Sequence, residues 1–161
     1  MPRWLLRDGR IVEDDWVYLA EAEGNPAAPL ILTLAEWQND RDQWLAQDRR
    51  LGVVLSPAHR VELLLADLPR LGLIAADFSG PGEGRGYSQA RILREQGKFG
   101  GELRARGYVR RDQLFFMARC GFNSFELPDA EIEAARGALA TFSWAYQPSN
   151  DAGLPLRLRH P

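Results

Sequence analysis

The sequence has few of the residues that form disulfide bonds or bind metal ions, and it lacks long apolar runs. Cys120 is the single cysteine among 161 residues, which excludes an intramolecular disulfide. No apolar run approaches the roughly 20 residues that cross a bilayer, and the N-terminal Met1-Pro2-Arg3-Trp4 lacks the basic-then-apolar layout of a secretion signal. His59 and His160 are the two histidines and lie far apart, without an acidic or cysteine cluster. We therefore expect a cytoplasmic protein without a metal site or membrane contact.

The composition is that of a folded domain of ordinary size. Hydrophobic residues make up 45% and charged residues 26% of the chain, which is the balance of a globular protein. From Pro148 onward, Pro, Gly, Asn and Arg dominate. We expect one α/β domain over residues 1–147, which includes an N-terminal hairpin, and a loose C-terminal tail over residues 148–161.

The first elements read as strands. Asp8-Gly9 lies between two short apolar segments and supplies the positive φ angles of a tight type I′ turn, which predicts a β-hairpin. Residues 16–19 are a candidate for a further short strand.

Beyond Pro29 the pattern changes to alternating strands and helices. Thr33 and Glu36 have the spacing of a capping box at a helix start, and Val61, Leu64, Leu65 and Leu68 form a helical stripe. Candidate strands begin near residues 30, 52, 73, 102 and 123. This rhythm predicts about five parallel β-α units with right-handed crossovers. An open sheet covered by helices is the first alternative, and a half-barrel arc, able to pair in a dimer, is the second.

Polar residues follow these strands where parallel α/β folds bind their ligands, beyond the carboxyl ends. The residues nominated in this way are Thr33, Ser56, Asp77, Arg106 and Glu126. Asp77 and Glu126 are candidates for proton transfer. For Asp77 the competing interpretation is a turn residue that accepts backbone hydrogen bonds. No Ser-His-Asp grouping and no cofactor motif is recognisable, so the sequence assigns no reaction.

Residues 79–86 form a glycine-rich loop that precedes a helix. Gly82, Gly84 and Gly86 would let backbone N–H groups approach an anion, and Arg85 would add a charged contact. The loop is neither a Walker motif nor a dinucleotide fingerprint. A flexible connection without a ligand is the alternative interpretation.

The segment from Gly80 to Cys120 holds nine Lys or Arg but only four acidic residues. This asymmetry hints at a small anion or an acidic protein patch, although helix surfaces are often rich in arginine. Arg111 opposes the dipole of the helix it opens, which makes it a further candidate for anion binding. No aromatic-basic nucleic-acid motif is present. An exposed Phe115 or Phe116 would favour a homodimer.

Several strings resemble one bacterial family of unknown function, DUF934. The resemblance runs through Gly82–Arg91, Gly101–Arg104, Arg111–Met117, Gly121-Phe122, Phe125–Leu127, Phe142-Ser143 and Tyr146-Gln147. It implies a place near assimilatory sulfite reductase, beside which members are commonly encoded, and it brings no catalytic residues with it. The first hypothesis is an accessory protein of assimilatory sulfate or sulfite reduction that contacts sulfite reductase or another enzyme of sulfur assimilation. The alternative is an enzyme or sensor that binds a small anion, a sulfur oxyanion or a nucleotide, at the strand ends.

Overall fold

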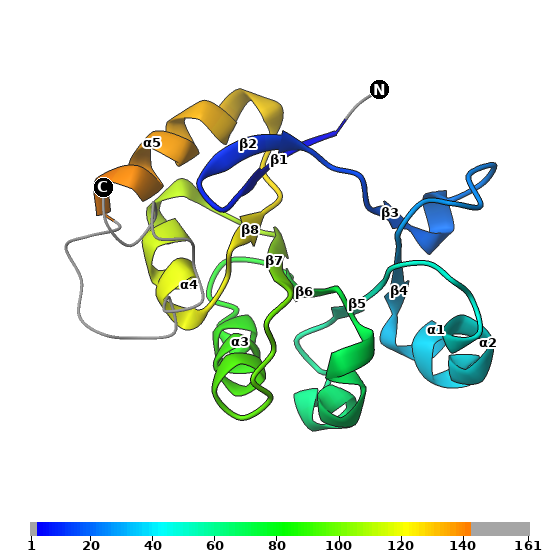
Figure 1. Ribbon diagram of the computed structural model, residues 1–161. Helices are drawn as coiled ribbons and strands as arrows, with labels where there is room; N and C mark the ends of the chain where they lie inside the picture. Colours follow the sequence, from blue (N-terminus) through cyan, green and yellow to red (C-terminus); the bar gives the residue numbers. More distant parts are fainter. Residues whose placement is uncertain (1–2, 143–161) are drawn as a thin grey trace.

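A computed structural model describes residues 3–142 of the chain, which form one eight-stranded sheet with helices (Figure 1). The strands are β1 (Trp4–Arg7), β2 (Arg10–Glu13), β3 (Val17–Tyr18), β4 (Leu30–Thr33), β5 (Leu51–Leu55), β6 (Leu73–Phe78), β7 (Glu102–Gly107) and β8 (Ser124–Phe125). The α-helices are α1 (Leu34–Asn39), α2 (Arg41–Leu45), α3 (Arg85–Glu95), α4 (Leu114–Cys120) and α5 (Ile132–Phe142). Short 3-10 helices are η1 (Leu19–Glu21), η2 (Val61–Arg70), η3 (Arg111–Gln113) and η4 (Asp129–Glu131). The expected tail over residues 148–161 lies outside the described residues.

The strand order is β2-β1-β8-β7-β6-β5-β4-β3, and the pairs from β3 to β8 are all parallel. Consecutive strands are therefore neighbours, as the regular spacing in the sequence predicts. Because this order never reverses, crossovers of one hand place their helices on one face of the sheet. Helices α1 to α4 lie along the convex side in Figure 1, and α5 packs against α4, β1 and β2. The sheet is open at both edges and curled into a half-barrel.

The N-terminal hairpin is confirmed in detail. Asp8 and Gly9 both have positive φ angles, 53° and 76°, as a type I′ turn requires. Strand β1 pairs antiparallel with β2 on one side and with β8 on the other. The hairpin therefore adds the two antiparallel strands at one end of the parallel sheet.

The expected stripe at residues 61–68 folds as the 3-10 helix η2 instead of an α-helix. A 3-10 helix repeats every three residues, so Val61, Leu64 and Asp67 share one buried face. The carboxylate of Asp67 accepts hydrogen bonds from Trp37 Nε1 and from the guanidinium of Arg41, at 2.6–2.9 Å. The three-residue repeat turns Asp67 toward the interior, and these hydrogen bonds satisfy its buried carboxylate.

Two further elements differ from expectation at their boundaries. The helix after β4 has the predicted capping box, with Thr33 and Glu36 bonded reciprocally, but it breaks at Asp40 into α1 and α2. Strand β8 covers Ser124–Phe125 only, although Asn123 and Glu126 still donate backbone hydrogen bonds to β7.

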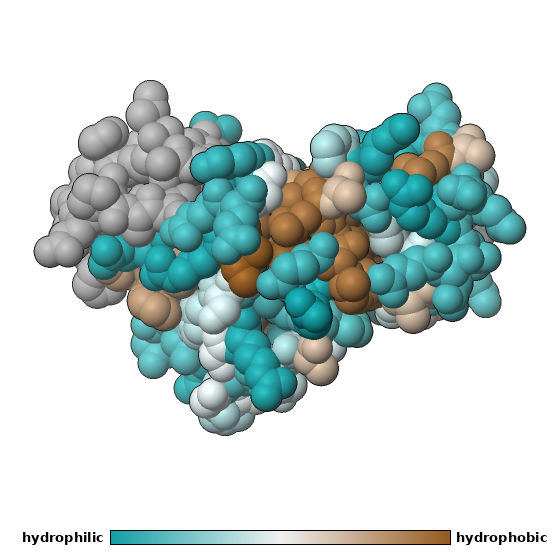
Figure 2. Space-filling view, turned by 90° about the horizontal axis from the view of Figure 1, so that it is seen from below, coloured by the Kyte–Doolittle hydropathy of each residue, from teal (hydrophilic) through white to brown (hydrophobic). Residues whose placement is uncertain are grey.

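Most of the core lies between the sheet and the helices. Side chains alternate along each strand, so Ile74, Ala76 and Phe78 of β6 face the helices. Leu73 and Ala75 of the same strand face the concave side, where they pack with Ile31 and Trp16. Seen from the helix side, hydrophobic residues gather near the centre of the surface (Figure 2). Within residues 3–142, no helix is both long and apolar enough to cross a membrane.

The short connection between β2 and β3 requires the sheet to curl. These strands are the two edges of the sheet, and in a flat sheet of eight strands they would lie roughly 34 Å apart. The chain from Glu13 to Val17 spans at most about 14 Å when fully extended. Residues 14–16, called here the crossing segment, therefore bridge the open side of an arc. Trp16 of this segment is buried against Ile31, Leu73 and Ala75 on the concave side.

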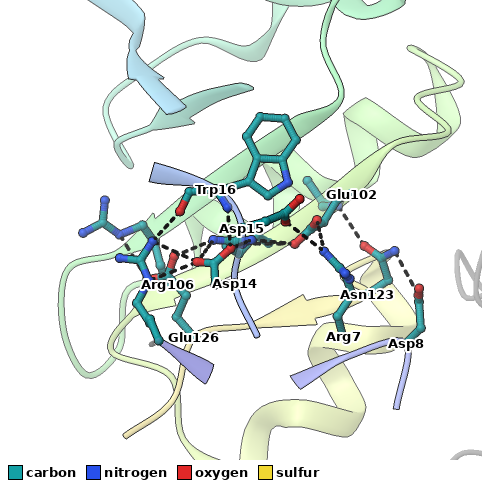
Figure 3. A network of polar contacts seen from close by, with 12 residues as sticks. Arg7, Asp8, Asp14, Asp15, Trp16, Glu102, Arg106, Asn123 and Glu126 are labelled. Carbon is teal, nitrogen blue, oxygen red and sulfur yellow. Dashed lines mark hydrogen bonds and ion pairs between the residues drawn. The ribbon is translucent and has the colours of Figure 1, made fainter. Parts of the chain in front are cut away.

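The crossing segment is anchored by a buried ion pair. The side chains of Asp14 and of Arg104 in β7 are both 0% exposed, and two hydrogen bonds of 2.9 Å join them. Arg3 donates a further hydrogen bond of 3.0 Å to Asp14. The next residue of the segment, Asp15, forms an ion pair with Arg50. Figure 3 shows this network on the concave side of the sheet.

We expect Asp14→Asn to destabilise the fold strongly, because Arg104 would remain buried without its bidentate partner. Breaking a buried pair by changing one member costs about 3–5 kcal/mol. Urea unfolding measures this loss. The control is Glu133→Gln in the exposed pair with Arg136, for which we expect a change below about 1 kcal/mol. Equal stability of the two variants would show that the ion pair does not anchor the segment.

Candidate functional site

Three of the residues nominated at the strand ends lie together on the concave face. Asp77 of β6 and Arg106 of β7 are direct partners in the parallel register. Glu126 follows β8, and its backbone N–H bonds the carbonyl of Ala105. Each of the three side chains therefore comes from a neighbouring strand, at the edge where parallel strands end.

Arg106 is held at the centre of this group without a close hydrogen bond. Its Nε lies 3.7 Å from Asp77 Oδ1 and 3.9 Å from Glu126 Oε2. The guanidinium carbon lies 4.4 Å from the centroid of the Tyr18 ring, a cation–π contact. Among the described residues, the buried Nε has no hydrogen-bond partner. The side chain is 32% exposed, so an external acceptor has access to the guanidinium.

Tyr18 connects the two ends of the parallel sheet. Its hydroxyl donates a hydrogen bond of 2.6 Å to Glu126 Oε1, although β3 and β8 are five strands apart in the sheet. Burial, reinforced by the negative charge of Glu126, raises the pKa of Tyr18 well above its ordinary value of 10.0. The phenol therefore keeps its proton and serves as a hydrogen-bond donor to the carboxylate.

A pocket with a volume of about 290 Å³ opens beside these residues. We call it the rim pocket. It is lined by Arg3, Tyr18, Leu19, Ala20, Glu21, Ile31, Thr33, Glu36, Val54, Arg106 and Glu126. Ile31 and Val54 come from the concave face of the sheet, whereas the charged groups come from both ends of the arc. The pocket therefore combines an apolar surface with cations and carboxylates.

Arg104 supports this site from below and was not among the residues nominated from the sequence. Its guanidinium also bonds Glu102 Oε1 at 2.9 Å and Glu126 Oε1 at 3.1 Å. Burial alone would lower the pKa of Arg104, but Glu102, Asp14 and Glu126 raise it above the ordinary value. Glu102, Arg104 and Arg106 alternate along β7, and this period of two is the signal that places three charged side chains on one face.

The glycine-rich loop lies at the same edge of the sheet but serves packing. A Cβ on Gly86 would lie 2.6 Å from the ring of Phe78, and Gly82 has a φ of 80°. The carboxylate of Glu83 accepts the backbone N–H of Arg85 at 3.0 Å, so a side chain of the loop occupies one donor expected to face an anion. Arg85 is exposed and Gly84 opens the helix as its N-cap. Anion binding by this loop stays a prediction.

Arg111 lies apart from the rim pocket. With Arg110, Asp112 and Glu131 it lines a second hollow of about 330 Å³, which shares no lining residue with the first. Asp77, Arg106 and Glu126 are therefore brought together, whereas Arg85 and Arg111 belong to other parts of the surface.

Part of the basic segment has a structural task. Arg94 donates hydrogen bonds to the carbonyls of Phe99, Gly101 and Gly121, at 2.7–3.0 Å. Burial lowers the pKa of Arg94 to about 10. Arg94 and Arg104 together account for two of the nine cations in residues 80–120. The positive charge available to a ligand is therefore smaller than the number of Lys and Arg residues in this segment indicates.

Neither aromatic residue of α4 is fully buried. Phe116 is 50% exposed, and its ring centroid lies 4.9 Å from that of Tyr87. Phe115 is half-buried. Cys120 is buried, as expected for a small hydrophobic residue, and burial raises the pKa of its thiol.

Sequence reasoning missed Arg3 and Tyr18. Both come from the N-terminal region, and they reach the rim pocket only because the crossing segment brings β3 across the concave side. No local motif marks them, but the short connection between the hairpin and the next strand is a usable signal, because it limits how far apart the sheet edges can lie.

Comparison with known proteins gives one family and no characterised relative. A family model described as a bacterial protein of unknown function, DUF934, matches residues 52–157. No curated protein matches the chain. The matched region begins within β5, so Arg3, Tyr18, Thr33 and Glu36 of the rim pocket lie before it.

Proposed function

This chain belongs to the DUF934 family of bacterial proteins, and we propose that it is an accessory protein of assimilatory sulfate or sulfite reduction that binds a small anionic compound in the rim pocket. The pathway rests on the family resemblance of the sequence, which implies a place near assimilatory sulfite reductase. The binding site rests on the geometry at the strand ends.

The observation that carries the binding site is the state of Arg106. A partly exposed guanidinium that makes only long ion pairs within the protein can donate charge-assisted hydrogen bonds to a ligand oxygen. Arg106 is in this state, because its ion pairs with Asp77 and Glu126 are 3.7 and 3.9 Å long, and its 32% exposed side chain lines a pocket at the edge where parallel α/β proteins bind ligands. Carboxylates, phosphates and sulfur oxyanions all offer the required oxygen atoms.

The two carboxylates beside Arg106 are engaged by contacts within the protein. Glu126 accepts hydrogen bonds from Tyr18 and Arg104, and these two contacts fix the position of its carboxyl group. Asp77 forms an ion pair with Arg106, with Oδ1 lying 3.7 Å from Nε. An enzyme that uses Asp77 or Glu126 as a general base is the second candidate, because both carboxylates lie next to the cation that would bind the substrate.

Titration calorimetry with sulfite, sulfate, adenosine 5′-phosphosulfate and isovalerate tests the site. We expect at least one of these anions to bind, and Arg106→Gln to weaken its binding about tenfold or more, which corresponds to one lost charge-assisted hydrogen bond.

Arg85→Gln is the matched control, because Arg85 is exposed and does not line the rim pocket. This variant should bind as the parent does. Absence of binding by all four anions, or equal binding by Arg106→Gln, would contradict the proposed site.

Deletion of the gene in its bacterium tests the pathway. Growth on sulfate as sole sulfur source should slow, whereas growth on a reduced sulfur source should not change. Co-purification with sulfite reductase would identify the partner directly. Normal growth on sulfate together with unchanged sulfite reductase activity would contradict the accessory role.

A further inference from the structure

The rim pocket carries more negative charge than a site for a simple anion needs. Alongside Arg3 and Arg106 it is lined by Glu21, Glu36 and Glu126. Glu126 is engaged by Tyr18 and Arg104, so its charge is largely matched within the protein. Glu21 of η1 and Glu36 of α1 remain as acids in the lining of the pocket. An isolated oxyanion beside them would be repelled.

These two acids are weakly matched by protein cations. Glu21 is mostly exposed, and its one ion pair in the described part of the chain reaches Arg3 at 3.7 Å, longer than a hydrogen bond. Glu36 Oε2 accepts the backbone N–H of Thr33 at 2.7 Å, which leaves Oε1 for another donor. Two carboxylates are therefore available to a cationic group on a ligand.

The pocket also offers more space and more apolar surface than an inorganic oxyanion would use. Its volume of about 290 Å³ corresponds to roughly ten water molecules at about 30 Å³ each, whereas sulfate has five heavy atoms. Leu19, Ala20, Ile31 and Val54 supply apolar surface between the charged groups. A ligand with an anionic end, a cationic end and a small apolar part would use every portion of this lining.

The geometry points to a small zwitterionic α-amino acid as the ligand of the rim pocket. Its carboxylate binds Arg106, its ammonium group binds Glu21 and Glu36, and its side chain packs on Ile31 and Val54. This inference rests on the proposed binding role of Arg106 and names the class of compound. It also gives the N-terminal region a part in recognition, since Glu21 and Glu36 both precede β5.

Calorimetry with three matched compounds separates the contributions of the two charges. L-Valine carries both charged groups, isovalerate lacks the amino group and isobutylamine lacks the carboxylate. L-Serine and L-cysteine, as further probes, vary the side chain. We expect the tightest amino acid to bind at least tenfold more tightly than isovalerate, because it adds a charge-assisted hydrogen bond. Isobutylamine lacks the carboxylate that binds Arg106 and should also bind at least tenfold more weakly than that amino acid.

The double variant Glu21→Gln/Glu36→Gln tests the ammonium site. Glutamine at position 36 still accepts the Thr33 N–H of the capping box, so the helix start is preserved. We expect amino-acid binding to weaken about tenfold or more while isovalerate binding is unchanged or improves. The control is Glu62→Gln/Glu133→Gln, which removes two exposed acids outside the pocket.

The outcomes distinguish this inference from the proposed function. If anions bind through Arg106 but an amino group gives no gain, the ligand is a simple anion and the amino-acid assignment is wrong. If amino acids bind equally well to Arg106→Gln, the assignment is also wrong. If none of the compounds binds, the proposed binding function fails and this inference fails with it.

Discussion

The short connection between β2 and β3 is the constraint on which the rest of the structure depends. Three residues join the two edges of an eight-stranded sheet, and their reach of about 14 Å is less than half the width of that sheet laid flat. The sheet must therefore curl. Its curl turns the strand ends toward one another, so that Tyr18 of one edge strand bonds Glu126 beyond β8.

The buried pair of Asp14 and Arg104 makes that geometry specific. Ion pairs of this kind add little net stability compared with apolar packing, because desolvation offsets their attraction. They do penalise any arrangement that leaves one partner alone. Asp14 therefore has one favourable position over β7. Arg104, which Asp14 holds in place, donates a hydrogen bond of 3.1 Å to Glu126 and so fixes the position of that carboxylate. The structural network and the rim pocket thus share a carboxylate.

Much of the fold that the sequence predicted depends on interactions between residues close together in the chain. The Asp8-Gly9 turn, the Thr33–Glu36 capping box and the β-α rhythm depend on neighbours in the chain, and each is present. The rule that ligands bind at carboxyl ends nominated Asp77, Arg106 and Glu126, which lie together. Arg3 and Tyr18 depend on the curl, a global property, and η2 depends on how Asp67 is paired. Neither the contacts of Arg3 and Tyr18 nor the 3-10 form of η2 is encoded in a local sequence pattern.

A double-mutant cycle between Tyr18→Phe and Glu126→Gln measures the contact across the arc most directly. The two residues belong to strands that a flat sheet would hold roughly 24 Å apart. If the crossing segment curls the sheet, their effects on the free energy of unfolding should be coupled by about 0.5–3 kcal/mol. Effects that add to within about 0.3 kcal/mol would contradict the curl of the sheet, and with it the rim pocket.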